Sequence, residues 1–225
     1  MIKNISNLGD AALYCDFGNE VNKSINSQVI KYFKTIKEKK FEGINNLTPS
    51  YNKLIISYDL KKTTFKEVKN YVENIDTEDT KDINSKKFEI PVCCHENFSM
   101  DIKRLEEILK LTREKILENF LNKEYFCYMT GFIAGMPFLG DLDENMRAQR
   151  LETPRVKVPK GSVALTEQFA NIYTFESPGG WNILGNTPLD VFDSSKEDKP
   201  NLINPGDTVI FKEITLDQYK NYNEQ

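Results

Sequence analysis

A polar stretch near the middle of the chain constrains the fold more than any other feature. Residues 76–87 read DTEDTKDINSKK and contain almost no apolar side chains, so they contribute little to a core. The chain of 225 residues is long enough for one large domain or two small ones. We therefore predict a boundary in this stretch, with a first domain over residues 1–84 and a second over residues 85–225.

The first domain has the hydrophobic spacing of alternating strands and helices. Residues 11–17 and 54–58 are short apolar runs that are typical of strands. Apolar side chains recur at helical spacing over residues 20–38, and Thr64 and Glu67 form a capping box before a second amphipathic stretch. The order β-α-β-β-α predicts a small ferredoxin-like α+β sandwich.

The second domain begins with a strand and two short helices, after which the pattern of apolar and turn-forming residues changes. Residues 88–94 indicate a strand, and helices are expected over residues 102–109, capped by Ser99, and over residues 112–120. From residue 125 onward, short apolar segments alternate with clusters of Gly, Pro, Ser, Asn and Asp. That pattern predicts a closed or nearly closed β-structure with tight turns, followed by a polar tail, DQYKNYNEQ.

Composition excludes two classes of partner. The formal net charge is −4 and the basic residues are scattered, so the chain has no basic stripe for nucleic acid. The N-terminus lacks the apolar core of a signal peptide, and no apolar run approaches the roughly 20 residues that cross a bilayer. Neither nucleic acid nor a membrane is an expected partner, and the expected location is the cytoplasm.

The cysteines and the single histidine limit the chemistry further. Cys15, Cys93, Cys94 and Cys127 include no C-x-x-C pair, which disfavours both disulfides and a zinc site. We expect these cysteines to be buried as small apolar residues, and we predict no metal site. His95 is expected in an exposed loop. A Cys93–His95 nucleophile–base pair is the alternative, because residues two apart share one face of a strand.

Three stretches of the second domain are candidates for ligand binding. The first, residues 131–140, reads GFIAGMPFLG, and its glycines let the backbone turn or approach a ligand closely. It is not a phosphate-binding P-loop, because no Gly-Lys-Ser/Thr follows. The candidate contacts are Gly131, Phe132, Gly135 and Phe138. A glycine-rich barrel corner is the structural alternative.

The second stretch, residues 153–163, reads TPRVKVPKGSV. Arg155 and Lys157 alternate with valines, so both are expected on one face of a strand. Two cations on one face can hold a carboxylate, and Ser162 is a further candidate for orienting a substrate. The alternative is a pair of solvated strand residues.

The third stretch combines a turn with the only tryptophan of the chain. Pro-Gly-Gly is a turn signal, and the tryptophan follows it at once. That side chain either packs in the core or forms one wall of a small-molecule pocket. The candidate residues are Ser177, Pro178, Gly179, Gly180, Trp181 and, a few residues later, Thr187.

These three stretches, in this order, resemble the bacterial family that includes the B subunit of 5-oxoprolinase, allophanate hydrolase subunit 1 and the sporulation kinase inhibitor KipI. The family patterns are a Gly-Phe-x-Pro-Gly-Phe-x-Tyr-Leu loop, a Thr-Pro-Arg-x-x-Val-Pro-x-Gly-Ser-Val strand, and Ser-Pro-Gly-Gly-Trp followed by x-Gly-Arg-Thr-Pro. The first half also agrees at residues 9–13, 49–51 and 90–93. The resemblance covers residues 9–211 and is specific, because the motifs are long and ordered.

The resemblance implies an α+β protein with a ferredoxin-like N-terminal domain and a cyclophilin-like β-barrel C-terminal domain. It also implies a larger sister chain, of the type of allophanate hydrolase subunit 2 or the C subunit of 5-oxoprolinase, related to the carboxyltransferase part of urea carboxylase. In 5-oxoprolinase the assembly uses ATP to open the lactam ring of 5-oxoproline, and a third, metal-handling subunit takes part. No cofactor is assigned to this chain, and any ATP is expected on the partner.

Several family positions carry other residues here. The histidine that often precedes the first loop is Phe120, and the arginine of the last motif is Asn186. The first loop has Ala134, Met136 and Phe138 in place of proline, phenylalanine and tyrosine. A site built to hydrogen-bond one substrate recognises it poorly without its polar groups. After Gly-Ser-Val, two glycines, a glutamine and a threonine of the family are replaced by Glu167, Asn171, Phe169 and Ala170.

Two functions of different classes follow from the resemblance. In the first, the chain is a subunit of an ATP-dependent amide or lactam hydrolase, in which Arg155 and Lys157 hold a carboxylate or developing negative charge. Backbone N–H groups of the first and third stretches would act as oxyanion donors, and Ser162 and Thr187 would orient the substrate. In the second, the chain is a non-catalytic regulatory subunit of KipI type. Peptidyl-prolyl isomerisation rests on the barrel resemblance alone.

Overall fold

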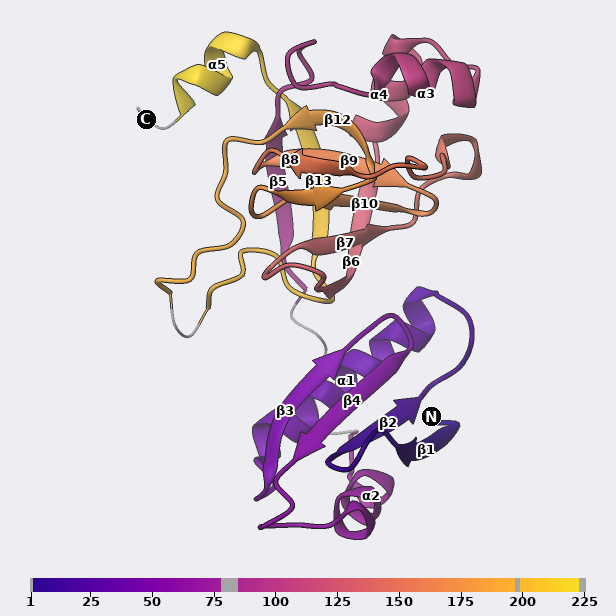
Figure 1. The fold of residues 1–225 in the computed structure, drawn as a ribbon, viewed down its shortest axis with the longest axis vertical. Helices are drawn as coiled ribbons and strands as arrows, with labels where there is room; N and C mark the ends of the chain where they lie inside the picture. The colour runs from indigo at the N-terminus through magenta and orange to yellow at the C-terminus, as the bar shows by residue number, and fades with distance from the viewer. Residues whose placement is uncertain (1, 78–84, 197–198, 223–225) are drawn as a thin grey trace. The chain divides into compact units, whose positions relative to one another are not determined.

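The computed structural model describes residues 2–77, 85–196 and 199–222 of the chain (Figure 1). The chain folds into two compact units, residues 1–84 and residues 85–225. Residues 78–84, part of the polar stretch predicted as a boundary, lie outside the described residues. The elements are β1 (Asn4–Asn7), β2 (Ala12–Asp16), α1 (Lys23–Lys39), β3 (Ile44–Pro49), β4 (Lys53–Tyr58), α2 (Phe65–Asn74), β5 (Lys87–Val92), α3 (Ile102–Leu109), α4 (Arg113–Leu121), β6 (Glu124–Thr130), β7 (Pro137–Gly140), the 3-10 helix η1 (Glu144–Met146), β8 (Arg155–Val158), β9 (Ser162–Thr166), β10 (Phe169–Ile172), β11 (Ser177–Gly179), β12 (Asn182–Asn186), β13 (Thr208–Glu213) and α5 (Leu216–Lys220).

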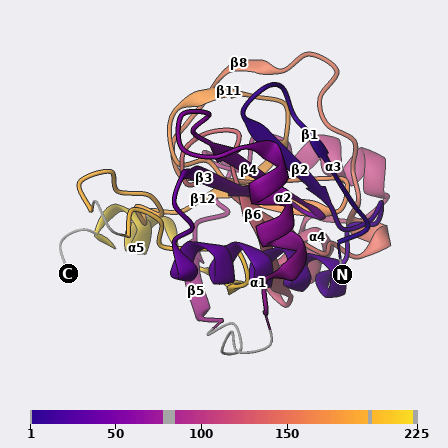
Figure 2. The same ribbon diagram turned by 90° about the horizontal axis from the view of Figure 1, so that it is seen from below.

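The first unit is an antiparallel sheet with both helices on one face. The strand order is β1-β2-β4-β3, and the two helices lie on the same side of these strands (Figure 2). Apolar side chains of α1 and α2 pack against those of the sheet in one core. The predicted ferredoxin-like sandwich is confirmed. Its fourth position is occupied by β1, which precedes β2 and was not predicted, because only Ile5 of its residues is apolar.

Side-chain caps set the helix boundaries in this unit. Asn22 accepts a hydrogen bond from the Ile25 N–H (2.9 Å), so α1 begins later than the predicted residue 20. The predicted capping box of α2 is confirmed. Thr64 Oγ1 accepts from the Glu67 N–H (3.4 Å), and the Glu67 carboxylate accepts from the Thr64 N–H (2.9 Å).

The second unit is built on a seven-stranded sheet that curls into a nearly closed barrel (Figure 1). Its order is β12-β9-β10-β7-β6-β13-β5, and β5 pairs with β13 in parallel. The two outer strands meet at one bridge, in which Cys93 and Asn186 exchange backbone hydrogen bonds of 2.8 and 3.0 Å. The predicted closed or nearly closed β-structure is therefore confirmed.

The barrel interior is filled by side chains. Apolar residues of the seven strands pack with α3 and α4 in one core. The rings of Phe120 on α4 and Phe211 on β13 stack at 5.0 Å, and Tyr125 donates a hydrogen bond to the Phe120 carbonyl. Phe120, which stands where the family often has a histidine, is thus a core residue of this barrel.

A separate two-stranded ribbon, β8 and β11, covers part of the opposite face of the sheet. Val158 of β8 packs with Tyr173, Ala164 of β9 and Ile183 of β12 in a second, smaller core. The ribbon contains both the arginine-lysine motif and the Ser-Pro-Gly motif. Packing of the ribbon on the sheet therefore decides where the candidate site lies.

Two local predictions for this unit are wrong. Asp101, not Ser99, is the N-cap of α3, and the Ser99 hydroxyl instead donates to the His95 carbonyl (3.0 Å). The C-terminal segment predicted as a polar tail contains α5, which Thr215 caps. Its Tyr219 packs against the Phe98 ring at 4.6 Å, a tertiary contact that local sequence does not reveal.

Among the described residues, no helix is both long enough and apolar enough to span a membrane.

The capping box gives a first testable prediction. Replacing Thr64 with Ala removes the acceptor for the Glu67 N–H and should destabilise α2 by about 1 kcal/mol. Faster hydrogen exchange of the α2 amides would report this loss. Thr64→Ser keeps the hydroxyl and serves as the matched control. Equal exchange in both variants would show that the cap contributes nothing.

Candidate functional site

The β8–β11 ribbon brings the arginine motif beside the Ser-Pro-Gly-Gly turn. Arg155 lies directly opposite Gly179 in the antiparallel register, and Ser177 lies opposite Val158. Both Ser177 and Gly179 are buried, whereas Pro178 between them is exposed, as expected for alternating strand positions. The backbone pairing therefore fixes Arg155 next to the turn that precedes Trp181.

One carboxylate holds this arrangement in place. Asp101 Oδ1 lies 2.5 Å from Arg155 Nη2, and Asp101 Oδ2 accepts a hydrogen bond from the Ile183 N–H (2.7 Å). The Asp101 side chain is 5% exposed and that of Arg155 is 27% exposed. Asp101 thus ties the start of α3 to β8 and β12. The sequence reasoning missed it, because it singled out Ser99 as the cap of the same helix.

Tyr173 lies beneath the turn and is the second residue that sequence reasoning missed. A Cβ on Gly179 would lie 2.1 Å from the Tyr173 hydroxyl oxygen, so only glycine fits there. Burial raises the pKa of Tyr173, while hydrogen bonds from the Trp181 amide and the Asn171 side chain partly offset that effect. Tyr173 therefore keeps its proton at neutral pH.

Three buried polar atoms around Tyr173 have no hydrogen-bond partner among the described residues. They are Arg155 Nη1, Asn171 Oδ1 and Ser177 Oγ. Native proteins satisfy nearly all buried polar groups, so three unsatisfied atoms on β8, β11 and β10 require an explanation. A small polar ligand or ordered water between the ribbon and the sheet would supply the missing partners.

Aromatic side chains border this polar group. Trp181 packs edge-to-face with Phe138 at 5.6 Å, and Phe138 meets Phe169 at 6.3 Å. The Met136 sulfur lies 4.0 Å from Asn171 Nδ2. Four positions where the chain departs from the family pattern therefore gather beside Trp181. Two of them, Phe138 and Phe169, replace a polar tyrosine and a polar glutamine of the family pattern with apolar rings.

Lys157 does not join Arg155 at one anion. The Lys157 ammonium lies 3.0 Å from the Glu176 carboxylate, and its side chain is 74% exposed. Arg155 instead pairs with the buried Asp101. The expectation of two cations converging on one carboxylate is therefore wrong, because each cation has its own acidic partner.

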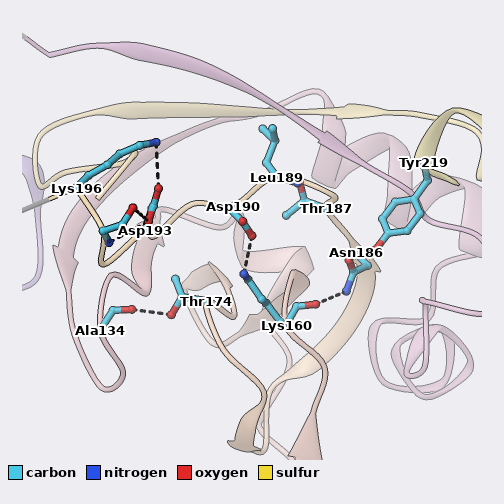
Figure 3. Close-up of polar contacts among 11 residues, drawn as sticks. Ala134, Lys160, Thr174, Asn186, Thr187, Leu189, Asp190, Asp193, Lys196 and Tyr219 are labelled. Carbon is cyan, nitrogen blue, oxygen red and sulfur yellow. Dashed lines mark hydrogen bonds and ion pairs between the residues drawn. The ribbon is translucent and has the colours of Figure 1, made fainter. Parts of the chain in front are cut away.

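Ser162 lies on β9 opposite β12, and Thr187 directly follows β12, where its hydroxyl serves the fold (Figure 3). Ser162 pairs with Asn186, and the Thr187 hydroxyl accepts a hydrogen bond from the Leu189 N–H (3.2 Å). The Asn186 side chain donates to the Lys160 carbonyl (2.9 Å) and accepts from the Tyr219 hydroxyl (2.7 Å). Asn186 thus anchors α5 to the barrel.

The first candidate loop, between β6 and β7, is fixed by packing. The Thr174 hydroxyl donates to the Ala134 carbonyl (2.6 Å), as Figure 3 shows, and a Cβ on Gly135 would collide with the Phe192 ring. Gly131 donates its N–H to the Met136 carbonyl (3.0 Å). Phe132 has a positive φ of 71° and is 72% exposed, so it does not belong to the buried polar group.

The thiols and the histidine do not form a nucleophilic pair. All four cysteines are buried and free, and burial raises the pKa of Cys15 and Cys94 to about 12. His95 accepts a hydrogen bond at Nδ1 from the Asn97 N–H (3.3 Å). Within the described ranges, no three His, Cys, Asp or Glu side chains are placed to bind a metal ion.

Thiol reactivity gives a second prediction. At pH 8 the folded chain should resist alkylation by iodoacetamide, because all four thiols are buried and burial raises the pKa of Cys15, Cys94 and Cys127. Mass spectrometry after labelling would detect any adduct, and the urea-unfolded chain is the positive control. Rapid modification of Cys93 alone in the folded protein would restore the nucleophile hypothesis.

A third prediction concerns the two glycines of the turn. Gly179→Ala should destabilise the second unit by about 1–3 kcal/mol, because its methyl group overlaps Tyr173. Gly180→Ala is the matched control, since a Cβ there meets its nearest atom at 3.4 Å, an ordinary contact. Urea unfolding followed by the fluorescence of Trp181 measures both. Equal stability of the two variants would contradict the overlap.

Comparisons with known proteins agree with this architecture. The family model described as "Carboxyltransferase domain, subdomain C and D" matches residues 3–203. The B subunit of 5-oxoprolinase from Bacillus subtilis (strain 168) is 34% identical over 233 residues, which cover 98% of this chain and 97% of that protein.

Two solved structures share the fold and are much longer than this chain. The protein TTHA0988 has a TM-score of 0.81 at 28% identity over 90% of this chain, which spans 40% of that chain. The urea carboxylase of Kluyveromyces lactis, at 18% identity, has a TM-score of 0.79 over 96% of this chain and 22% of its own. By its family model and its full-length relative, the chain belongs to the family of carboxyltransferase domain subdomains C and D.

Proposed function

We propose that this chain is the smaller subunit of a cytoplasmic ATP-dependent amide or lactam hydrolase, which acts with a larger sister subunit on a small C–N-bonded substrate. The observation that carries this proposal is the group of unsatisfied polar atoms around Tyr173, held by the Arg155–Asp101 pair. The similarity to the B subunit of 5-oxoprolinase over nearly the whole chain supports the same reaction class.

The site's chemistry favours binding and orientation. Arg155 Nη1, Ser177 Oγ and Asn171 Oδ1 are a donor, a donor or acceptor, and an acceptor, which together match an amide's C=O and N–H groups. Tyr173 remains protonated and can donate to a developing negative charge. The buried thiols supply no nucleophile, so the partner is expected to complete the catalytic site.

The greater length of a related protein supports the proposal that this chain has a partner subunit. In TTHA0988, which is 28% identical, this fold occupies 40% of the matched chain. A domain that is covalently joined to further sequence in that protein is expected to meet a separate larger subunit here. The sister subunit is therefore proposed as a stable partner that binds ATP.

The regulatory alternative of KipI type requires a surface that contacts another protein, and Phe132 is suited to such a contact. Phe132 combines a positive φ, which is unfavourable for a bulky side chain, with an exposed fraction of 72%. An exposed phenylalanine in a strained backbone suits a protein contact. That contact serves either a sister subunit or a regulated partner, so the activity of the assembly decides between the two.

The decisive experiment is to co-purify the chain with the products of neighbouring genes and to assay ATP-dependent hydrolysis of 5-oxoproline. We expect turnover by the assembly and none by the isolated chain. Within the assembly, Arg155→Gln should reduce turnover because it leaves Asp101 without its partner, whereas Lys157→Gln should not.

Two results would overturn the proposal. One is equal turnover by the isolated chain, which would remove the need for a partner. The other is an intact assembly with the larger subunit that hydrolyses neither 5-oxoproline nor another small amide. The second result would favour the regulatory alternative.

A further inference from the structure

Arg150 is an exposed arginine beside the Gly179–Gly180 turn that no motif singled out. The N–H of the next residue, Leu151, donates to the Gly180 carbonyl (2.7 Å), which fastens this segment to the turn. A Cβ on Gly180 would lie 3.4 Å from both Nε and Nη2 of Arg150. Both nitrogens therefore lie beside Gly180, and the missing side chain at this position leaves them uncovered on that side.

The cations around this turn differ in whether an acidic side chain pairs with them. Asp101 neutralises Arg155, and Glu176 neutralises Lys157. In the part of the chain that the structure describes, no acidic side chain lies within 4.0 Å of Arg150 in an ion pair. Arg150 is therefore the cation at this turn whose charge remains uncompensated.

Arg150 and Arg155 both influence the pKa of Tyr173 through their positive charges. Burial raises the pKa of Tyr173 most, and the positive charges of both guanidinium groups lower that pKa. Arg155 lies opposite Gly179 in the ribbon, whereas Arg150 lies beside Gly180. One arginine is thus fixed and neutralised by a buried acid, and the other is solvent-accessible.

We infer that Arg150 binds the carboxylate of the substrate, and that it makes the site selective for small cyclic amides that carry a carboxylate over neutral ones. This inference rests on the proposed function and assigns a role within the same site. The Nε–Nη2 edge of a guanidinium matches the two oxygens of a carboxylate in a bidentate pair. The glycine at position 180 leaves that edge open.

Arg155 has a different role in this arrangement. Its Nη2 is occupied by Asp101, so it positions the turn, and its Nη1 is left to bind a ligand. A carboxylate held by Arg150 would place the amide of a small ring over the unsatisfied atoms around Tyr173. In this arrangement Arg150 binds the carboxylate of the ligand. The amide of the ligand is recognised by Arg155, Asn171 and Ser177.

The single tryptophan provides a direct test that does not require activity. Trp181 follows Gly180, so its fluorescence in the full chain reports ligand binding at the turn. Titration with 5-oxoproline should give a saturable change. 2-Pyrrolidinone, the same lactam ring without the carboxylate, should bind much more weakly.

Variants of the full chain identify the residue responsible. Arg150→Gln should weaken 5-oxoproline binding roughly 10- to 100-fold, the usual effect of losing a charge-assisted pair, and should leave 2-pyrrolidinone binding unchanged. Arg150→Lys should recover part of the affinity. Lys157→Gln is the matched control, because it removes another exposed cation of the same region and should bind like the wild type.

Gly180→Ala offers an independent check, since its methyl group covers the Nε–Nη2 edge while keeping the fold. It should weaken 5-oxoproline binding and not that of 2-pyrrolidinone. Equal affinity for the two lactams, an unchanged affinity in Arg150→Gln, or no saturable signal would each overturn the inference. The hydrolysis assay tests the proposed function separately, because turnover by the wild-type assembly does not depend on which residue binds the carboxylate.

Discussion

The second unit depends on the bridge between Cys93 and Asn186, which closes its barrel. Cys93 and Asn186 exchange two backbone hydrogen bonds, and Gly185 allows the strands to approach because a Cβ there would lie 2.7 Å from the Cys93 carbonyl oxygen. Cys93, a candidate nucleophile in the sequence, and Asn186, which replaces the arginine of a family motif, therefore have structural roles. Cys93 pairs through its backbone and buries its thiol, while the Asn186 side chain connects the seam to Lys160 and to α5.

The candidate site follows from that closure. Once β12 is held in the barrel, Asp101 can bond its backbone at Ile183 and pair with Arg155 on the separate ribbon. A buried acid with two such partners is stable, whereas removal of either partner would leave a desolvated charge. The ribbon in turn places Gly179 over Tyr173. The site is therefore assembled by tertiary contacts between distant segments.

This dependence explains what the sequence could predict. The capping box of Thr64 and Glu67 and the apolar periodicity of α1 involve residues close together in the sequence. Both could therefore be predicted from the sequence. The edge strand β1, the helix α5 and the role of Asp101 depend on partners far along the chain. Of the predicted site residues, Arg155 and Gly179 lie opposite each other because their two motifs pair as one ribbon, whereas Lys157 forms an ion pair with Glu176.

The parallel pairing of β5 with β13 also sets the order of events during synthesis. The strand at residues 87–92 emerges early, yet its neighbour at residues 208–213 is made more than a hundred residues later. The first unit has every strand it needs by residue 58 and can fold while translation continues. The nascent barrel must wait with an unpaired edge, which makes that interval its most aggregation-prone stage.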